Sequence, residues 1–574
     1  MTNHEVAQVF FTIADLLEIK GEVIYKVMAY RQAAQSILDL GQDIEAVWRA
    51  GQLHTIPGVG KAIARKIDEL LRTGRLGYYE QLKAEIPPTL VDVLRVPDVG
   101  PKKTALFWKA LGITTLAQLE EAARAGRLRT LPGIGEKTEA KILKNIESLR
   151  GRTERIPLGA AWQTAQAFLE ALARVPGVVH VAAGGSLRRM RDTIGDIDLL
   201  VATNDPEAVM DAFVSHPQVA SVVMRGPTRA SVLVHRGQQV DIRVLPPERW
   251  GTLLQYFTGS IAHNIHLRSL AQDMGLSLSE YAITRPDGSE ILCPTEEEVY
   301  RALGLPWIPP ELREDRGEIE AALAGELPHL VEARDIRGDL QMHTTWSDGS
   351  ASVAEMAAAA AAKGLEYILI SDHSPSLGVA RGLSAERLHQ QWEEIAAVNA
   401  AAGPVRVLRG TEVEIHNDGS LDYPDNVLAS LDIVVAALHT GLRQSRQQVT
   451  RRLLAAIANP HVDIIAHPSG RLISEREPAD VDMEAIFRAA AQAGTILEIN
   501  ADPHRLDLDD GHAHRALQLG VKLAINSDAH NPDAVGDLRF GLGMARRAWA
   551  TPADIVNTWP LEKLLEYVRQ RSTH

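Results

Sequence analysis

From about residue 335 onward, short apolar segments alternate with helical patterns, and this alternation restricts the possible fold more than any other feature. Seven segments are predicted to end strands: GDLQMHT (338–344), 367–374, 406–416, 432–440, 462–470, 495–503 and 522–530. Strands separated by helices pair in parallel, so this regular alternation predicts a closed parallel barrel. Functional side chains of such barrels gather at the carboxyl ends of the strands.

Most of these strand ends carry a residue type that binds metal ions. The candidate ligands are Gln341, His343, Asp348, His373, Glu412, His439, His467, Asp528 and His530. A lone histidine at a strand end is most often a hydrogen-bonded structural residue, but so many candidates at one end of a barrel predict a metal centre of two or three ions. Mixed imidazole and carboxylate ligands favour Mn²⁺, Zn²⁺ or Fe²⁺ over Mg²⁺ alone. Multi-metal sites of this kind hydrolyse phosphoesters.

Gln341 stands where a histidine would complete an alternating pair with His343. An amide oxygen can coordinate a hard ion, but it is neutral and a poorer ligand than imidazole for Zn²⁺. We interpret this as one weakened metal position and a site shifted towards Mn²⁺.

A second carboxylate cluster is predicted in the middle of the chain. In GGSLRRMRDTIGDIDLLVAT (184–203), Asp196 and Asp198 are two residues apart on a strand and project to one face. Asp241 lies on another alternating strand, QQVDIRVLP (238–246). Three neighbouring carboxylates can hold two Mg²⁺ or Mn²⁺ ions for phosphoryl transfer. A bare DxD is more often a surface loop, but here GGSLRR precedes it, and Gly185, Ser186, Arg188 and Arg189 suit a triphosphate.

Three short repeats lie near the N-terminus: IPGVGKAIARKI (56–67), VPDVGPKKTALF (96–107) and LPGIGEKTEAKI (131–142). Each reads as a helix, a glycine turn and a second helix. Backbone N–H groups at such turns suit phosphate oxygens. The residues expected to contact DNA there are Gly58, Gly60, Gly100, Gly133, Gly135, Lys61, Lys102, Lys103 and Lys137. A glycine turn used only for packing is the alternative for a single copy.

Composition is compatible with these interpretations. The net charge is −14, but the acidic excess lies in the C-terminal half, whereas the repeat region is basic. The single cysteine, Cys293, excludes a disulfide framework or a cysteine-based zinc site. Neither an apolar run of membrane-spanning length nor a signal-peptide pattern is present, so we expect a cytoplasmic protein without a membrane partner.

The central motifs GGSLRRMRDTIGDIDLL, VDIRV and YFTGS (256–260) resemble the nucleotidyltransferase core of family X DNA polymerases, the polymerase-beta-like repair class. The resemblance implies that Asp196, Asp198 and Asp241 bind the catalytic metals. It also assigns residues around the incoming nucleotide and the template strand, which are Gly185, Ser186, Arg189, Tyr256, Phe257, Gly259, Asn264 and Arg268. There are two departures: Gln239 replaces an arginine of vertebrate relatives near the primer terminus, and Ile265 replaces a positive residue near the template base.

The strand-end motifs SDG, DH, GTE, LHT, AHP and SDAH resemble, in order, those of the PHP domain (polymerase and histidinol phosphatase). The whole chain is therefore similar to a bacterial or archaeal family X polymerase with a C-terminal PHP domain. The resemblance implies a Mn²⁺-stimulated 3′–5′ exonuclease, with 3′-phosphatase or abasic-site endonuclease activity as further options.

Members of this polymerase family often have a lyase in the first domain, which works through a lysine Schiff base. By the local match, the candidate nucleophile is Lys66, with Lys26 and Tyr30 as phosphate-binding or orienting groups. One supporting lysine of the family falls on Ala62. A solvated surface lysine is the alternative for Lys66.

We therefore expect a multidomain chain. Its parts would be a helical end-binding domain (1–85), a fingers-like domain with further helix-hairpin-helix motifs (86–150), an α+β palm (151–255), a thumb-like domain (256–315), a linker (316–334) and a distorted (β/α)7 PHP barrel (335–574). The expected protein is a monomeric repair polymerase acting on gapped or primer-template DNA and deoxynucleoside triphosphates. Two alternatives stay open: a nuclease whose polymerase core serves DNA binding, and a non-catalytic DNA-end scaffold.

Overall fold

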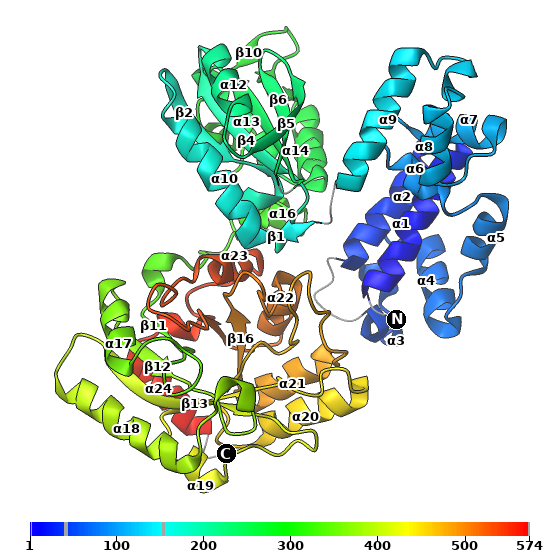
Figure 1. Ribbon diagram of the computed structural model, residues 1–574. Helices are drawn as coiled ribbons and strands as arrows, with labels where there is room; N and C mark the ends of the chain where they lie inside the picture. Colours follow the sequence, from blue (N-terminus) through cyan, green and yellow to red (C-terminus); the bar gives the residue numbers. More distant parts are fainter. Residues whose placement is uncertain (2, 39–43, 152–154, 236, 572–574) are drawn as a thin grey trace. The chain divides into compact units, whose positions relative to one another are not determined.

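The computed structural model describes residues 1, 3–38, 44–151, 155–235 and 237–571. The chain divides into two compact units, Met1–Thr153 and Glu154–His574 (Figure 1). The expected boundary between residues 150 and 151 adjoins residues 152–154, which lie outside the described residues. None of the helices in the described part of the chain is long and apolar enough to cross a membrane.

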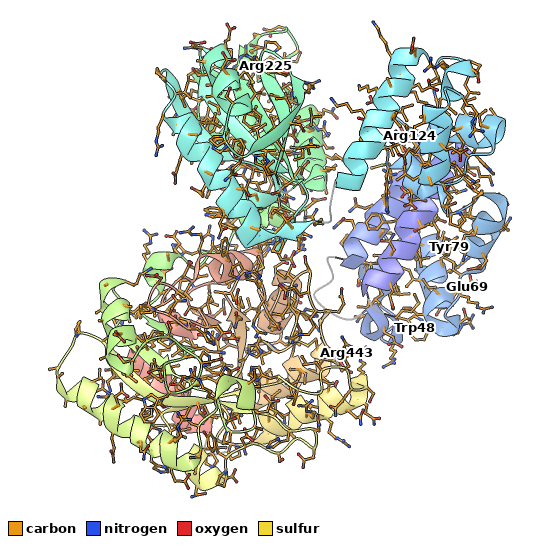
Figure 2. All side chains as sticks on the ribbon, in the orientation of Figure 1. Trp48, Glu69, Tyr79, Arg124, Arg225 and Arg443 are labelled. Atoms are coloured by element: carbon orange, nitrogen blue, oxygen red, sulfur yellow. The ribbon has the colours of Figure 1, made fainter. Side chains whose placement is uncertain are left out.

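The first unit is helical around one apolar core. Its helices are α1 (Asn3–Lys20), α2 (Ile24–Leu38), α3 (Ile44–Arg49), α4 (Lys61–Thr73), α5 (Gly77–Glu85), α6 (Leu90–Leu94), α7 (Pro101–Leu111), α8 (Leu116–Arg124) and α9 (Glu136–Gly151). The indole N–H of Trp48 donates to Asp68 of α4 at 2.7 Å, and Glu69 accepts from the backbone N–H of Gly77 at 2.7 Å (Figure 2). These bonds connect α3, α4 and α5.

The second unit begins with a five-stranded sheet of order β2-β4-β7-β6-β5, in which β4 and β7 are parallel. Its elements are β1 (Ile156–Pro157), α10 (Leu158–Ala173), β2 (Val178–Ala183), α11 (Gly185–Arg188), β3 (Thr193–Ile194), β4 (Ile197–Thr203), α12 (Pro206–Val214), β5 (Val219–Arg225), β6 (Arg229–Val234) and β7 (Gln239–Leu245). Successive side chains of β4 point to opposite faces of the sheet. Ile197 and Leu199 belong to the apolar core that includes α10, so Asp198 lies on the opposite face.

A smaller helical region with a three-stranded sheet follows. It comprises α13 (Trp250–Thr258), α14 (Ile261–Asp273), β8 (Ser277–Leu278), β9 (Ile283–Thr284), β10 (Glu290–Ile291), α15 (Glu296–Ala302) and α16 (Glu318–Ala324). Its own apolar cluster includes Leu267, Tyr300 and Leu312. Thr295 caps α15 with a capping box, and this fixes the position of Glu296 in the first turn.

The C-terminal part is the expected parallel barrel. Seven parallel strands pair in chain order: β11 (Gly338–Asp339), β12 (Tyr367–Ile370), β13 (Arg406–Glu414), β14 (Ile433–Ala437), β15 (Ile464–Ile465), β16 (Ile496–Asn500) and β17 (Leu523–Asn526). A bridge between Met342 and Ala529 joins the ends of the first and last strands, so the barrel is nearly closed. The surrounding helices are α17 (Val353–Ala362), α18 (Ala385–Ala400), α19 (Asp425–Leu428), α20 (Arg446–Ala458), α21 (Met483–Ala493), α22 (Asp510–Gln518), α23 (Arg539–Arg547) and α24 (Leu561–Arg571).

The barrel and the five-stranded sheet share a continuous apolar core. Trp162 of α10 meets Phe540 of α23 edge to face, with ring centroids 6.1 Å apart. Gly159 lies so close to Pro503 that an added Cβ would approach its ring at 2.6 Å. The first residues of α10 therefore pack directly on the barrel.

Candidate functional site

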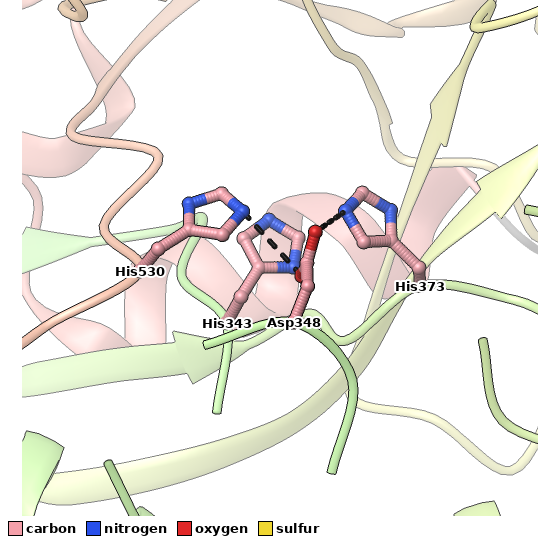
Figure 3. Close-up of side chains that lie close together, drawn as sticks. All are labelled: His343, Asp348, His373 and His530. Atoms are coloured by element: carbon pink, nitrogen blue, oxygen red, sulfur yellow. Dashed lines mark ion pairs between the residues drawn. The ribbon is translucent and has the colours of Figure 1, made fainter. Parts of the chain in front are cut away.

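The carboxyl ends of the barrel strands bring the predicted ligands together. His343, Asp348, His373 and His530 each offer a ligand atom, and these atoms lie within 4.8 Å of one another (Figure 3). Two further groups meet the same criterion: His373 with Glu412 and His439, and His343 with Glu412 and Asp528. Because the groups share members, the geometry suits more than one ion.

Glu412 is the central carboxylate of this cluster. Its oxygens lie 2.9 Å from His467 Nε2, 3.2 Å from His373 Nδ1 and 3.3 Å from His439 Nε2. Burial alone would raise the pKa of Glu412, but the imidazoles of His439 and His373 hold that pKa well below its usual value. An ionised carboxylate enclosed by imidazoles is a donor set for a divalent cation.

Several buried polar atoms of the cluster have no hydrogen-bond partner. They are the Nδ1 atoms of His343 and His467 and both amide atoms of Gln341, a residue with no exposed surface. Buried polar groups are normally paired, and leaving one unpaired costs about 1–3 kcal/mol. Coordination of metal ions would supply the missing partners, so the residues fit a multinuclear metal centre.

Residues outside the predicted set hold the ligands in place. Glu414 lies 2.8 Å from His439 Nδ1 and accepts the backbone N–H groups of His439 and Thr440. Burial opposes protonation of His439, yet Glu412 and Glu414 together raise its pKa to about 10. Carboxylates behind a ligating histidine orient its ring and raise its basicity. The sequence signal for Glu414 was its place in GTEVE, two residues beyond Glu412 on the same face of β13.

Asp372 has a similar supporting role next to His373. It is fully buried and accepts hydrogen bonds from the backbone N–H of Thr344 at 2.8 Å and the Thr344 hydroxyl at 2.6 Å. Ser347 and Gln391 also donate to it. These bonds shape the loop that carries Asp348, so Asp372 is structural although it adjoins a candidate ligand.

The palm aspartates form a second cluster. Asp198 and Asp241 are direct partners on the parallel strands β4 and β7, and Asp196 immediately precedes β4. Burial raises the pKa of Asp198 to about 7, and the carboxylates of Asp196 and Asp241 contribute to the rise. Gly185 abuts Asp198 so closely that an added Cβ would lie 2.2 Å from Oδ2. Mutually repelling carboxylates of this kind fit divalent cations, which would neutralise them.

Gln239, a departure from the family pattern, orients Asp241. Its amide nitrogen lies 3.0 Å and 2.9 Å from the two carboxylate oxygens, and the Ser231 hydroxyl donates to one of them. Burial raises the pKa of Asp241, while the bonds from Ser231 and Gln239 oppose that rise. Gln239 and Ser231 therefore support a candidate metal ligand that the sequence identified without them.

The two arginines of GGSLRR have different environments. Arg188 forms a bidentate pair with Glu296 at 2.7 and 2.8 Å, which connects the palm to α15. Its guanidinium is thus a structural link, unlike the phosphate-binding group that the sequence suggested. Arg189 donates to Glu314 at 3.0 Å and to the carbonyl of Thr258 at 2.8 Å. Its charge lowers the pKa of Asp198, although burial has the larger and opposite effect.

The YFTGS turn is shaped by Asn264. The Asn264 amide donates to the carbonyls of Tyr256 at 2.7 Å and Gly259 at 3.3 Å, and its oxygen accepts from Gln255 at 2.9 Å. Gly259 is required here, since an added Cβ would lie 2.5 Å from Asn264 Oδ1. The Phe257 ring is covered by the guanidinium of Arg243 at 5.3 Å.

On α14, one turn beyond Asn264, Arg268 donates its Nε to the Asn264 carbonyl at 3.2 Å. Ile265 on the same helix is 45% exposed. Arg268 is half-buried. Under the predicted assignment, the template strand would pass beside Ile265 and Arg268.

The three glycine turns of the helical unit share one backbone conformation. Gly58 and Gly133 have φ of 74° and 77°, and the equivalent residue of the second repeat, Asp98, has φ of 66°. Gly60 and Gly100 cap the helices α4 and α7. An added Cβ at Gly60, Gly100 or Gly135 would meet nothing within 4 Å, so these turns are open to a ligand.

The lysines near the glycine turns occupy different structural positions. Lys103 donates to the carbonyl of Asp98 at 2.8 Å and so stabilises the second turn itself. Lys61 and Lys102 are the first and second residues of α4 and α7, at helix starts that suit anions.

Lys66, Lys26 and Tyr30 gather around Tyr78, which sequence reasoning had not included. The ammonium of Lys66 lies 4.8 Å from the centroid of the Tyr78 ring, and that of Lys26 lies 5.9 Å from it. Tyr30 stacks on the same ring at 6.1 Å, and burial raises the pKa of Tyr30. The signal available in the sequence was the GYYE segment at the start of α5.

Comparison with protein families gives four matches along the chain. Residues 1–76 match a helix-hairpin-helix domain, and residues 90–148 match a SAM-like helix-hairpin-helix tandem. Residues 253–314 match the DNA polymerase beta thumb, and residues 339–502 match the PHP domain.

Similar proteins extend over the whole chain or over parts of it. A protein of Bacillus subtilis strain 168 described as DNA polymerase/3′–5′ exonuclease PolX is 38% identical over 573 residues, which covers 99% of this chain and 100% of that protein. DNA polymerase lambda of Rattus norvegicus is 25% identical over 54% of this chain and 56% of its own length. A probable phosphatase of Thermoanaerobacter sp. strain X514 is 32% identical over 40% of this chain and 95% of its own length.

Proposed function

The chain belongs to the bacterial PolX group of family X DNA polymerases, and on this premise we propose that it fills short gaps in DNA and trims 3′ ends, using two separate sites. The observation that carries the proposal is the presence of two carboxylate-rich clusters in one chain, one in the palm and one at the barrel ends. Nucleotide addition is assigned to the first cluster and 3′–5′ exonuclease activity to the second.

We assign the individual roles in the palm as follows. Asp196, Asp198 and Asp241 would hold two Mg²⁺ or Mn²⁺ ions, which when bound supply charge neutralisation for the entering and leaving oxygens. The primer 3′-oxygen attacks the α-phosphorus of the nucleotide, and pyrophosphate leaves. Gly185, Ser186 and Arg189 would bind the triphosphate, and Arg189 is held in place for this by Glu314 and Thr258. The remaining assignments are Tyr256, Phe257 and Gly259 beside the sugar, Asn264 near the base and Arg268 near the template.

At the barrel, the ligand set is Gln341, His343, Asp348, His373, Glu412, His439, His467, Asp528 and His530. This set would hold two or three ions of Mn²⁺, Zn²⁺ or Fe²⁺, which when bound provide Lewis acidity for phosphodiester hydrolysis. Glu414 and Asp372 position the ligands and the Asp348 loop. Similarity to a probable phosphatase favours removal of a 3′-phosphate as a second activity of this site.

We further propose that the helical unit grips the backbone of a gapped duplex through its three glycine turns. The open surface at Gly60, Gly100 and Gly135 supports this role, and Lys61 and Lys102 at the starts of α4 and α7 add positive charge. The division into domains at residues 85, 150, 255, 315 and 334, a monomeric state and action in the cytoplasm belong to the same proposal.

One experiment tests both activities. A 5′-labelled duplex with a one-nucleotide gap is incubated with Mg²⁺ or Mn²⁺, with and without nucleotides, using wild type, Asp241→Ala and a His373→Ala/His467→Ala double variant. We expect Asp241→Ala to lose extension and keep trimming, and the double variant to show the reverse. Extension by Asp241→Ala at the wild-type rate would refute the palm assignment, and unchanged trimming by the double variant would refute the barrel assignment.

A second substrate tests whether the barrel also removes a 3′-phosphate. A primer ending in a 3′-phosphate is offered to the same three proteins without nucleotides. Release of inorganic phosphate by wild type and Asp241→Ala, but not by the double variant, would assign phosphomonoester hydrolysis to the barrel.

A further inference from the structure

The palm segment Arg189–Asp192 lies between the glycine loop at 184–185 and strand β4, which carries Asp198, and the barrel contacts this segment at three points. Arg547 of α23 donates to the backbone carbonyl of Arg189 at 2.8 Å. Gly543, one turn earlier on α23, faces Met190. Arg471, which follows β15, donates to Asp192 at 3.0 Å. The backbone and side chains of this segment are thus positioned by a domain that contributes nothing to the palm cluster itself.

Arg547 is the most constrained of these contacts. Its side chain has no exposed surface, and the same Nη1 that reaches Arg189 also donates to Glu314 at 2.8 Å. Its Nη2 donates to Asp510 at 2.9 Å, and Asp510 in turn accepts from Arg316 at 3.0 Å. A planar guanidinium that bonds three acceptors in fixed directions restrains all of them.

Glu314 transmits this restraint to the Arg189 side chain. The same Glu314 oxygen, Oε1, accepts from Arg189 Nε at 3.0 Å and from Arg547 Nη1 at 2.8 Å. Burial disfavours the charged carboxylate, but Arg189 and Arg547 hold the pKa of Glu314 far below its usual value, so it stays ionised. Arg547 therefore restrains Arg189 twice, once through its carbonyl and once through its guanidinium partner.

The Met190 contact is independent of charge. Met190 has φ of 54°, in the left-handed region, and a Cβ added at Gly543 would lie 2.7 Å from its Cβ. The close approach of helix α23 to Met190 requires glycine at this position. Any side chain at 543 would push the segment that carries Arg189.

We propose that Arg547 is a positioning residue for nucleotide addition, through which the PHP barrel fixes the position of Arg189. The inference deepens the proposed function and rests on it, because it takes Arg189 as a ligand of the incoming triphosphate. It makes the barrel a structural component of the polymerase site, apart from any hydrolysis at its own metal ligands.

The test compares four variants with wild type in single-nucleotide gap filling and in exonuclease assays on the full chain. Arg547→Ala removes both restraints, and Arg547→Lys keeps the charge near Glu314. Gly543→Ala displaces Met190 without a change in charge. Arg546→Ala is the matched control, since Arg546 is adjacent on α23 and pairs with Glu311 at 2.7 Å and the carbonyl of Val331 at 3.0 Å.

Misplacement of a binding group by about 1 Å can cost on the order of a hundredfold in rate. We expect Arg547→Ala and Gly543→Ala to raise the KM for the nucleotide about tenfold, with a smaller fall in kcat and exonuclease within about twofold of wild type. Arg547→Lys should recover part of the loss, and Arg546→Ala should keep the wild-type KM. If Arg547→Ala is insoluble, the KM and kcat values of Gly543→Ala and Arg547→Lys test the inference in its place.

Two results would overturn the inference. One is a folded Arg547→Ala protein, or a folded Gly543→Ala protein in its place, with wild-type KM and kcat. The other is an equal loss of gap filling and exonuclease activity, which would show a general role in folding. A wild-type protein that adds no nucleotide would refute the proposed function, whereas an active wild type with an unaffected Arg547→Ala variant refutes only the role of Arg547.

Discussion

Asp198 and Asp241 are opposite each other in the register of the parallel strands β4 and β7, so their carboxylates emerge side by side on one face of the sheet. Parallel pairing of two strands from distant parts of the chain creates this juxtaposition, which neither strand has alone. Burial and the nearby carboxylates raise the pKa of Asp198 to about 7.

The first prediction concerns the repulsion between the neighbouring carboxylates of the palm cluster. At pH 8 without metal, Asp198→Asn should stabilise the protein by about 1–2 kcal/mol, because it removes a buried charge next to two others. Added Mg²⁺ should stabilise wild type more than the variant. Urea unfolding with and without Mg²⁺ measures both effects. Asp205 is an exposed acid beyond the end of β4. The control variant Asp205→Asn should change neither the stability without metal nor the stabilisation by Mg²⁺. Equal Mg²⁺ stabilisation of wild type and Asp198→Asn would contradict this prediction.

The second prediction concerns Gln341, which is fully buried with both amide atoms unpaired. Gln341→His should increase the zinc bound per chain, since imidazole is a better ligand for Zn²⁺ than an amide. It should also reduce the stimulation of the exonuclease by Mn²⁺. Gln341→Leu, of similar size without a ligand atom, should bind less metal than wild type. Elemental analysis after dialysis against each metal is the measurement, and identical metal content in the three proteins would exclude Gln341 as a ligand.

The third prediction concerns Glu414 behind His439. Glu414→Gln keeps the shape but removes the charge that faces His439 Nδ1 at 2.8 Å. Loss of such a partner typically weakens metal binding about 10–100-fold. A titration of exonuclease activity against Mn²⁺ should therefore shift to higher concentration, with the maximum rate largely retained. Glu394→Gln, which removes the charge of a carboxylate bonded to Trp346, is the control and should leave the titration in place. A variant curve that overlays wild type would rule out this role for Glu414.

The fourth prediction concerns Lys66 in the helical unit. If Lys66 forms a Schiff base with an abasic sugar, borohydride should trap wild type on a 5′-incised abasic duplex, and Lys66→Ala should reduce trapping at least about tenfold. Lys61→Ala, on the same helix α4, should trap as wild type does, but it should bind DNA more weakly at low salt, with a smaller dependence of affinity on salt. Undiminished trapping by Lys66→Ala would remove this residue from the role.

The barrel was predictable from sequence because each strand end carries its own signal. The apolar run and the ligand at its carboxyl end are local, and parallel pairing then brings the ends together. His343, Glu412 and Asp528 lie far apart in sequence, yet they meet as the strand order requires. Strand alternation likewise predicted a shared face for Asp196 and Asp198, and the pairing of β4 with β7 places Asp241 opposite Asp198.

What could not be predicted depends on contacts between elements without a local signal. Arg188 and Arg189 are adjacent and chemically identical, but Arg188 pairs with Glu296 and Arg189 pairs with Glu314. That difference arises from the docking of α15 and α23, which no pattern near residue 188 reveals. Asp98 occupies a left-handed position where the other repeats have glycine, and its carboxylate pairs with Asn145 and Lys141 of α9.

The last prediction uses Asp463, a buried carboxyl at the start of β15, at the end of the barrel opposite the metal ligands. Its carboxylate accepts the backbone N–H of Val434 at 2.9 Å, and Arg571 lies 3.9 Å away. Burial raises the pKa of Asp463 to about 7, from about 4 when unfolded. The folded state therefore retains a proton that the unfolded state releases, so this residue makes stability fall as pH rises from about 4 to about 7.

Asp463→Asn stays neutral and keeps an oxygen for Val434. The free energy of unfolding of this variant should equal that of wild type near pH 4. At pH 8.5 it should exceed that of wild type by about 1–3 kcal/mol, because the cost of ionising the buried carboxyl is removed. Asp432→Asn serves as an opposite control: although burial raises the pKa of Asp432, the bonds from Arg409 lower it overall, so this variant should lose more stability at pH 8.5 than at pH 4. Urea midpoints at several pH values measure both trends. A constant difference between Asp463→Asn and wild type across this range would show that Asp463 does not titrate on unfolding.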